Sequence, residues 1–339
     1  MKKKKFKYVD YLWNDKKAAA LKKDEVALFL YRSNLLGADL RITNFGGGNT
    51  SCKTIEKDPL TKEKTEVMWV KGSGGDIGTL TRKGIAGLYT NRLRDLKNIY
   101  RGLKHEDEMV GLLYHCIYDL DSRAPSIDTP LHGLLPFKHI DHLHPDALIA
   151  IAAAKDSEKI TKEIWGETMG WVPWRRPGFQ LALELEKCLA DHPNIRGIVL
   201  GSHGLFTWGD TSKECYLNSL EVIEQGSKYI AQREGKKRKV FGGQKIKSLA
   251  PTKRKSQAVS IAPILRGLCS SHKGMIGHFT DDKRVLQFLE SKDLGKLAPL
   301  GTSCPDHFLR TKIKPLVLKL KPNEDLSNSK KVKEKIEKQ

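Results

Sequence analysis

A basic block without a single acid divides this sequence and limits how it can fold. Between Gly235 and Ser256 there are nine lysines and arginines and no Asp or Glu. Like charges at this density cannot be buried together, so the block is typical of a linker. We therefore expect a domain over residues 1–235, a basic linker over 236–256, a small α/β unit over 257–322 and a disordered lysine-rich tail over 323–339.

Charge and composition exclude several protein classes. Much of the net charge of +20 comes from the first five residues, the basic block and the tail. The longest uncharged apolar run near the middle, Ala147–Ala154, is far shorter than the roughly 20 residues of a membrane helix. Six dispersed cysteines indicate reduced thiols in a cytoplasmic protein. We expect no membrane partner, and no nucleic-acid partner either, because Phe241 is the only aromatic residue in the basic block.

Hydrophobic periodicity predicts that helices and strands alternate in the first domain, which favours a mixed β-sheet flanked by helices. The expected helices are Glu25–Leu36, Glu106–Leu120 and a long one to about Glu234 that Thr211 and Glu214 open as a capping box. The expected strands are Asp39–Phe45, Val67–Val70, Ile198–Leu200 and Leu205–Trp208. In the small unit we expect helices at Ile261–Leu268 and Lys283–Leu289 and a strand at Met275–Phe279.

Three histidines form the sharpest candidate site. His142 and His144 are two residues apart, so on a strand both imidazoles project from the same face. His203 lies in a Gly-Ser-His-Gly turn between two predicted strands. Three imidazoles with an open position are the usual catalytic zinc arrangement. The alternative is that these are ordinary structural histidines, and His139 could replace one member of the set.

A carboxylate and two glycine-rich segments accompany the histidines. Asp128 lies shortly before them and could exchange a proton next to a metal-polarised carbonyl, or it could simply open the turn before Pro130. The segments Asn44–Ser51 and Lys71–Gly75 follow or adjoin predicted strands, and their backbone N–H groups could bind a phosphate. Each alone could be a turn, and neither matches the P-loop or the dinucleotide-binding fingerprint.

Taken in order, these segments resemble the class II aldolase/adducin family over roughly residues 25–235. The matching motifs are Asn44–Ser51, Lys71–Gly75, Asp128 with His132, His142 with His144, and His203. The resemblance implies zinc, or another divalent metal, held by His142, His144 and His203, with Asp128 as the catalytic base. The family usually has Glu at that position. It also implies that the substrate phosphate is bound by Asn44, Gly47, Gly48, Asn49, Lys71, Gly72, Ser73, Gly74 and Ser126.

One branch of the family is more similar still, the aldolase half of the bifunctional rhamnulose-1-phosphate aldolase/alcohol dehydrogenase proteins. The similar stretches are Ala124–His132, Pro136–Asp146, Gly170–Trp174 and Gly301–Arg310. This implies a lyase that acts on rhamnulose 1-phosphate. The family resemblance also implies a homo-oligomer, for which a tetramer is the suggested state. Because no glycine-rich turn after Pro251 fits a dinucleotide, we expect no nicotinamide cofactor. The alternatives are another sugar-phosphate enzyme, an epimerase or a dehydratase, and a non-catalytic adducin-like binding protein.

Overall fold

The computed structural model describes residues 5–234, 239–318 and 329–338, in two compact units. The first unit comprises the residues up to Glu234 together with the short segment Ser303–Asp306. The second comprises the residues from 239 to Thr302 and from His307 onward. Residues 236–238 of the predicted linker, and 323–328 and 339 of the predicted tail, lie outside the described residues.

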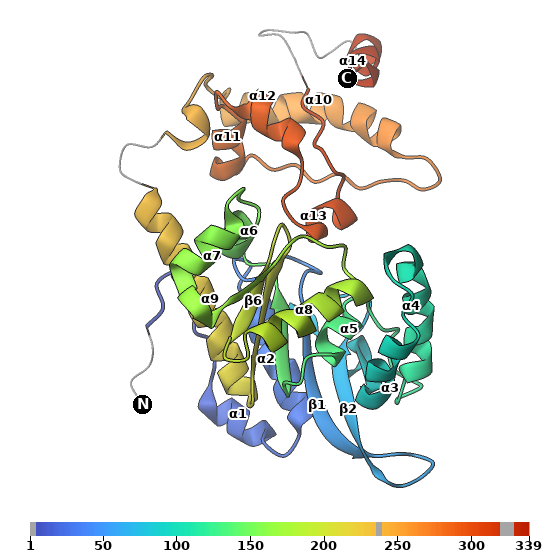
Figure 1. Cartoon of the computed structure of the whole chain (residues 1–339). Coiled ribbons are helices and arrows are strands. Elements are labelled where there is room, and N and C mark those ends of the chain that lie inside the picture. Colours follow the sequence, from blue (N-terminus) through green and yellow to red (C-terminus); the bar gives the residue numbers. More distant parts are fainter. Residues whose placement is uncertain (1–4, 235–238, 319–328, 339) are drawn as a thin grey trace. The chain divides into compact units, whose positions relative to one another are not determined.

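A seven-stranded mixed β-sheet forms the centre of the first unit (Figure 1). The strands lie side by side in the order β3-β2-β1-β4-β7-β6-β5. Along the sequence they are β1 (Asn49–Lys57), β2 (Lys64–Lys71), β3 (Ile85–Tyr89), β4 (His139–Leu143), β5 (Gly170–Val172), β6 (Gly197–Leu200) and β7 (Gly204–Gly209). Neighbouring strands are antiparallel except for β5 and β6, which are parallel. The predicted mixed sheet is therefore confirmed.

Helices cover both faces of this sheet, and each face has its own hydrophobic core. The first face is covered by α2 (Glu25–Gly37), α6 (Asp146–Ala152), α7 (Ser157–Trp165) and α9 (Ser212–Arg233), with α1 (Asp15–Leu21) beside α2. The second face is covered by α3 (Thr90–Asp95), α4 (Glu106–Leu112), α5 (Thr129–Gly133) and α8 (Phe179–Asp191). Because β4 and β7 are central strands, their side chains are buried on both faces.

The helix starts follow from local sequence. Thr211 is the N-cap of α9, and its hydroxyl accepts a hydrogen bond from the backbone N–H of Glu214 at 3.2 Å. The carboxylate of Glu214 in turn accepts from the backbone N–H of Asp210. Asp24 caps α2 in the same way by accepting from the N–H of Ala27. The predicted helices from residue 25 and from residue 211 are confirmed.

Two predictions in the first unit are wrong. Residues 39–45 form turns, not a strand, because the carboxylate of Asp39 binds the backbone N–H and the guanidinium of Arg41 and so competes with sheet pairing. The strand begins only after the glycines, at Asn49. The helix predicted over Glu106–Leu120 ends at Leu112, continues as a 3-10 turn (η5, Leu113–Cys116), and gives way to a β-bridge between Ile117 and Leu88.

The second unit is helical and not α/β. Its helices are α10 (Pro251–Cys269), α11 (Lys283–Leu289), α12 (Leu294–Leu297) and α14 (Ser329–Glu337), while α13 (Pro305–Arg310) begins within the segment of the first unit. α11 coincides with a predicted helix, and α10 contains another. The last residues of the predicted linker are helical because Pro251 occupies the first turn of α10, where a missing N–H costs nothing.

The strand predicted over Met275–Phe279 is wrong, since the described part of this unit contains no β-strand. The N–H and the carbonyl of Met275 are bound instead by the hydroxyl of Ser270 and the guanidinium of Arg266, and Ile276 is 96% exposed. A small core forms where Val332 and Ile336 of α14 pack against apolar side chains of α10.

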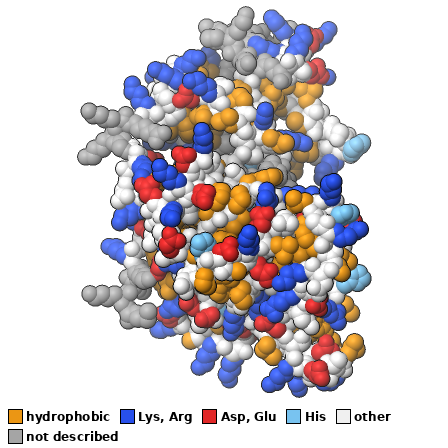
Figure 2. Space-filling view, in the orientation of Figure 1, with side chains coloured by type: hydrophobic (Ala, Val, Ile, Leu, Met, Phe, Trp, Pro, Cys, Tyr) orange, Lys and Arg blue, Asp and Glu red, His pale blue; other side chains and the backbone are white. Residues whose placement is uncertain are grey.

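Acidic and basic side chains are interspersed on the surface of the first unit. Figure 2 shows red and blue side chains alternating over the part of the molecule that holds the sheet. Exposed ion pairs such as Arg94 with Glu66 and Lys97 with Glu186 belong to this surface. Among the described residues, no helix combines the length and the apolar character that a membrane span requires.

Candidate metal centre

Strand pairing brings the three predicted histidines together. His142 lies near the end of β4 and His144 directly follows that strand, so both project from the face that α5 covers. β7 pairs with β4, and the turn that precedes β7 carries His203 to the same place. All three side chains are buried, with exposures of 1%, 5% and 2%.

The imidazole nitrogens converge on one point. Nε2 of His142 lies 3.0 Å from Nε2 of His144 and 3.2 Å from Nε2 of His203. Nδ1 of His142 donates to the carbonyl of Leu205 at 3.1 Å, which leaves a lone pair on its Nε2. Lone pairs at these separations repel one another unless a cation or a proton lies between them. The donor set therefore fits a divalent metal ion with three neutral imidazole ligands.

The electrostatic environment keeps the imidazoles of His142 and His203 neutral, as metal ligation requires. Burial holds the pKa of His142 well below its ordinary value, and the neighbouring imidazoles of His144 and His203 lower it further. Burial likewise holds the pKa of His203 well below its ordinary value, and His144 adds to the effect. Neutral histidines bind a metal without first having to lose a proton.

Glycine at position 204 gives His144 the space it occupies. A Cβ atom at Gly204 would lie 2.5 Å from Cδ2 of His144 and 2.6 Å from the carbonyl oxygen of Leu143. The second contact is with backbone that cannot move without disturbing β4. The Gly-Ser-His-Gly turn thus supplies one ligand and leaves room for another.

His139 does not belong to this group. It lies three residues before His142, so the alternation of β4 turns its side chain to the opposite face of the sheet. There its Nδ1 lies 2.8 Å from the guanidinium of Arg32, and its Nε2 lies 3.1 Å from the carboxylate of Glu25. The structure therefore removes His139 as a substitute ligand.

The first glycine-rich segment borders the metal centre. Gly46 and Gly48 adopt positive φ, and the segment ends as β1 begins with Asn49, which pairs in register with His142. The side-chain amide of Asn49 donates to the hydroxyl of Ser126 at 2.8 Å, while its Oδ1 is buried without a partner in the described residues. A buried amide oxygen of this kind is available to a ligand hydroxyl.

The second glycine-rich segment lies beside the first. Lys71, the last residue of β2, is 4% exposed, and its carbonyl accepts from the side chain of Asn49 at 3.4 Å. A carboxylate oxygen of Asp76, just beyond this segment, accepts from the N–H of Gly46 at 3.3 Å. Ser73 and Gly74 are exposed at the rim. The sheet order therefore brings together two segments that are separated by 19 residues in the sequence.

Sequence reasoning gave no role to Arg123, which lies against the second segment. Its Nε donates to the carbonyl of Ser73 at 2.9 Å, and its side chain passes 2.5 Å from where a Cβ atom of Gly72 would lie. The backbone N–H of Ser73 donates to the carbonyl of Ala124 at 2.8 Å. A guanidinium in this position adds positive charge beside the proposed phosphate-binding residues.

Asp128 lies just before α5 and is half-buried at the same centre. Its backbone N–H donates to the hydroxyl of Ser126 at 3.2 Å. Burial raises the pKa of its carboxyl group above the ordinary value, against the opposing influence of His144 and Lys71, and the charge of Asp306 raises it further. A carboxyl group with a raised pKa next to a metal centre is suited to exchanging protons.

Two more residues at the centre had no role assigned from sequence. His132 on α5 places its Nδ1 2.8 Å from the hydroxyl of Ser51, and its Nε2 is buried without a partner among the described residues. Burial lowers the pKa of His132 to about 3. The other is Asp306, whose carboxylate meets Nδ1 of His144. His132 belongs to the motif with Asp128, and Asp306 lies in the similar stretch Gly301–Arg310, but neither pattern assigned a role to the residue.

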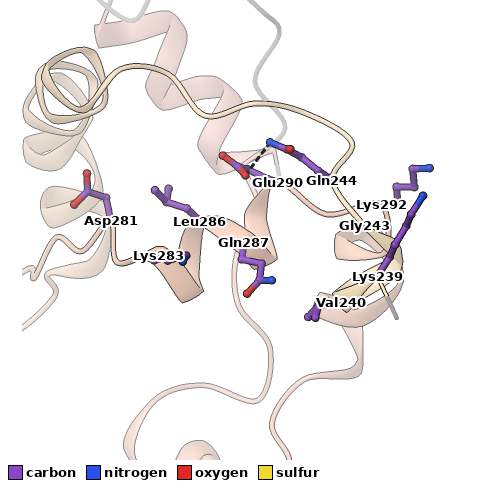
Figure 3. Close-up of a pocket in the computed structure, with 10 residues that line it drawn as sticks. All are labelled: Lys239, Val240, Gly243, Gln244, Asp281, Lys283, Leu286, Gln287, Glu290 and Lys292. Atoms are coloured by element: carbon purple, nitrogen blue, oxygen red, sulfur yellow. Dashed lines mark hydrogen bonds between the residues drawn. The ribbon is translucent and has the colours of Figure 1, made fainter. Parts of the chain in front are cut away.

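A separate cavity of about 780 Å³ lies within the second unit (Figure 3). It is lined by Lys239, Val240, Gly243, Gln244, Asp281, Lys283, Leu286, Gln287, Glu290 and Lys292. Its acidic groups are already bound, since Asp281 pairs with Arg254 and Glu290 accepts from the side chain of Gln244 and the backbone of Ser248. Among the described residues, the one cluster of histidine, cysteine or acidic side chains that could hold a metal ion is His142, His144 and His203 in the first unit.

The sequence matches the models of two domains of one protein family. Residues 30–228 match the family model of the class II aldolase and adducin N-terminal domain, and residues 256–339 match that of the second domain of class II aldolase. The chain is 41% identical over 314 residues to the uncharacterized oxidoreductase YuxG of Bacillus subtilis (strain 168). That match covers 93% of this chain and 45% of YuxG, so the chain spans about half the length of this relative.

One solved structure supports the same fold. The N-terminal class II aldolase domain of a conserved protein from Thermoplasma acidophilum is 30% identical, with a TM-score of 0.57, over 67% of this chain and 99% of that one. A sugar-phosphate aldolase from Thermotoga maritima is 12% identical, with a TM-score of 0.46, over 62% and 95%. Because a family model matches more than half of its residues, the chain belongs to the class II aldolase and adducin family.

Proposed function

We propose that this protein is a zinc-dependent lyase that reversibly cleaves rhamnulose 1-phosphate to dihydroxyacetone phosphate and lactaldehyde. One observation carries the proposal: three buried imidazoles converge beside a carboxyl group with a raised pKa. A non-catalytic binding module has no need of this arrangement. The family membership supports a lyase, while the choice of sugar rests on the resemblance of Ala124–His132 and Pro136–Asp146 to one branch.

The residues of the centre would have two roles, metal binding and proton transfer. His142, His144 and His203 would hold the ion, which when bound supplies Lewis-acid stabilisation of the negative charge that develops on the sugar oxygens. Asp128 takes the proton from the C4 hydroxyl as the C3–C4 bond breaks, so lactaldehyde leaves. The bonding electrons remain on the three-carbon fragment as an enediolate, and Asp128 returns the proton to C3.

The glycine-rich segments provide the binding side of the proposal. Lys71 and the backbone of Gly72 and Ser73 would bind the phosphate, with Arg123 as a second cation. Asn49, whose Oδ1 is buried and unpartnered, would accept a hydrogen bond from a sugar hydroxyl. Asn44, Gly47, Gly48, Gly74 and Ser126 complete the proposed binding set. We also propose that the enzyme acts in the cytoplasm as a homo-oligomer.

The test is a coupled assay for dihydroxyacetone phosphate. Purified full-length chain, loaded with Zn²⁺, is given rhamnulose 1-phosphate, fuculose 1-phosphate and a pentulose phosphate in parallel. We expect release from rhamnulose 1-phosphate, its loss after treatment with a chelator, and its recovery when metal is restored. His142→Ala is the matched inactive control.

Other outcomes would favour other members of the family. Release from fuculose 1-phosphate alone would reject the proposed sugar and keep the lyase. Interconversion of pentulose phosphates without release of a triose would indicate an epimerase. If metal-loaded protein acts on none of these compounds, the lyase proposal is wrong and a binding role becomes the better explanation.

A further inference from the structure

The metal centre contains a side chain from a distant part of the sequence. Asp306 follows His144 by 162 residues, yet its Oδ2 accepts a hydrogen bond from Nδ1 of that histidine. Asp306 is 9% exposed, and Cys304 beside it is 2% exposed. The segment Ser303–Asp306 belongs to the first compact unit, although the residues on both sides of it belong to the second.

Asp306 makes His144 different from the other two candidate ligands. Nδ1 of His142 donates to a backbone carbonyl, and Nδ1 of His203 is buried without a partner among the described residues. His144 alone of the three has an anionic acceptor on Nδ1. A carboxylate in this position keeps the proton on Nδ1, directs the lone pair of Nε2 to the centre and makes the imidazole a stronger ligand.

The first glycine-rich segment is shaped to admit this carboxylate. A Cβ atom on Gly47 would lie 2.3 Å from Oδ2 of Asp306 and 2.9 Å from its Cγ. Gly47 does not adopt positive φ, in contrast to Gly46 and Gly48, so its conformation does not require glycine. A Cβ atom at position 47 would enter the space that Asp306 occupies, and it would also lie 3.2 Å from the backbone carbonyl oxygen of Asn44. The hydrogen bond to His144 and this close approach to Gly47 involve the same carboxylate oxygen, Oδ2.

We propose that Asp306 is a positioning residue that orients His144 for metal binding. The inference rests on the proposed metal site but not on the identity of the substrate. In this proposal the segment Ser303–Asp306 contributes a carboxylate to the metal centre, whose other residues all lie before residue 204. Gly47, which has no Cβ atom, leaves the space through which the Asp306 carboxylate reaches His144.

The experiment measures metal affinity in the full-length chain, without any substrate. Zn²⁺ and Co²⁺ dissociation constants are determined by chelator competition for wild type, Asp306→Ala and Asp306→Asn. We expect Asp306→Ala to bind the metal about 10- to 100-fold more weakly, the usual effect of removing an outer partner of a ligand histidine. Asp306→Asn should lie between the two, because an amide oxygen still accepts from Nδ1 but carries no charge.

Two further variants separate the carboxylate from the packing of its segment. Cys304→Ala truncates a buried neighbour and leaves the carboxylate in place, so its metal affinity should stay close to that of wild type. Gly47→Ala should weaken metal binding as Asp306→Ala does, and the double variant should lose no more than either single one. An equal loss in Cys304→Ala would overturn the proposal, and so would wild-type affinity in Asp306→Ala.

A spectroscopic readout reports on His144 directly. In the metal-free chain labelled with ¹⁵N-histidine, NMR should show His144 protonated on Nδ1 in wild type and a mixture of tautomers in Asp306→Ala. An unchanged tautomer would contradict the orienting role. If metal affinity falls as expected but no sugar phosphate is cleaved, the lyase proposal fails and the role of Asp306 stands. A wild-type chain that binds no divalent metal would overturn both.

Discussion

Removing the charge of Arg32 should destabilise the first unit more than any surface substitution. Arg32 on α2 is fully buried, and its guanidinium bridges four groups on the sheet and α9. Nε lies 2.9 Å from Oδ1 of Asp141, and Nη2 donates to the carbonyl of Ser51 at 2.8 Å. Asp141 is next to His142 in β4, so this pair anchors the strand that bears two proposed ligands.

The structure sets the expected magnitude. Arg32→Met keeps most of the side-chain volume but leaves the carboxylate of Asp141, which is 0% exposed, without its cation. Breaking a buried ion pair from one side costs about 3–5 kcal/mol, because a buried charge loses its compensation. Replacing both partners, as in Arg32→Met with Asp141→Leu, should recover much of that loss. The exposed pair of Arg94 and Glu66 is the control, and Arg94→Met should cost about 0–1 kcal/mol.

Tryptophan fluorescence during urea unfolding is a suitable assay. All six tryptophans precede residue 209, so their emission reports on the first unit. The midpoint and the slope are compared among wild type, the two single variants and the double variant. If Arg32→Met costs no more than Arg94→Met, or if the double variant is less stable than Arg32→Met, the reasoning about a buried uncompensated charge is refuted.

Three further predictions concern the site. His144→Ala should lose most of a bound ion that is otherwise close to one per chain, as measured by metal analysis, and full retention would exclude it as a ligand. Lys71→Ala and Ser73→Ala should weaken binding of dihydroxyacetone phosphate in calorimetry without loss of metal, and unchanged affinity in both would move the phosphate elsewhere. His132 has a folded-state pKa of about 3 against about 6.5 when unfolded, so its contribution to stability is present above pH 6.5 and is lost as the pH falls toward 3. Below pH 6.5 this histidine makes the free energy of unfolding fall by about 1.4 kcal/mol per pH unit. His132→Gln should remove that part of the pH dependence. An unchanged pH profile would contradict the burial of His132 as a neutral imidazole.

Much of the site could be predicted because its signals are local. The spacing of His142 and His144 on a strand places both side chains on one face of the sheet. The Gly-Ser-His-Gly turn between two strands indicates that the side chain of His203 can reach a site at the strand ends. The same alternation could have excluded His139, since an odd offset of three residues from His142 points a strand side chain the other way. The capping of α9 by Thr211 is equally local and was predicted correctly.

Predictions failed where hydrogen bonds or strand pairing, or the lack of a partner strand, overrode the apolar pattern. Residues 39–45 have strand-like composition, but the Asp39 carboxylate binds Arg41 and prevents pairing. The apolar periodicity of Glu106–Leu120 continues past the end of α4, yet Ile117 forms a bridge to β3 and leaves the helix. The segment Met275–Phe279 resembles a strand, but no partner strand is available to it in the described residues.

The sequence by itself determined which residues could bind a metal and a phosphate, because ligand type and spacing are properties of short segments. Only the tertiary structure decided that Asn49, Lys71, Asp128 and the three histidines meet at one end of the central strands, since strand order is set by pairing between distant segments. Asp306 is the extreme case. Its contact with His144 joins residues 162 positions apart and depends on the absence of a Cβ atom at Gly47. No pattern within a short segment of sequence predicts such a contact.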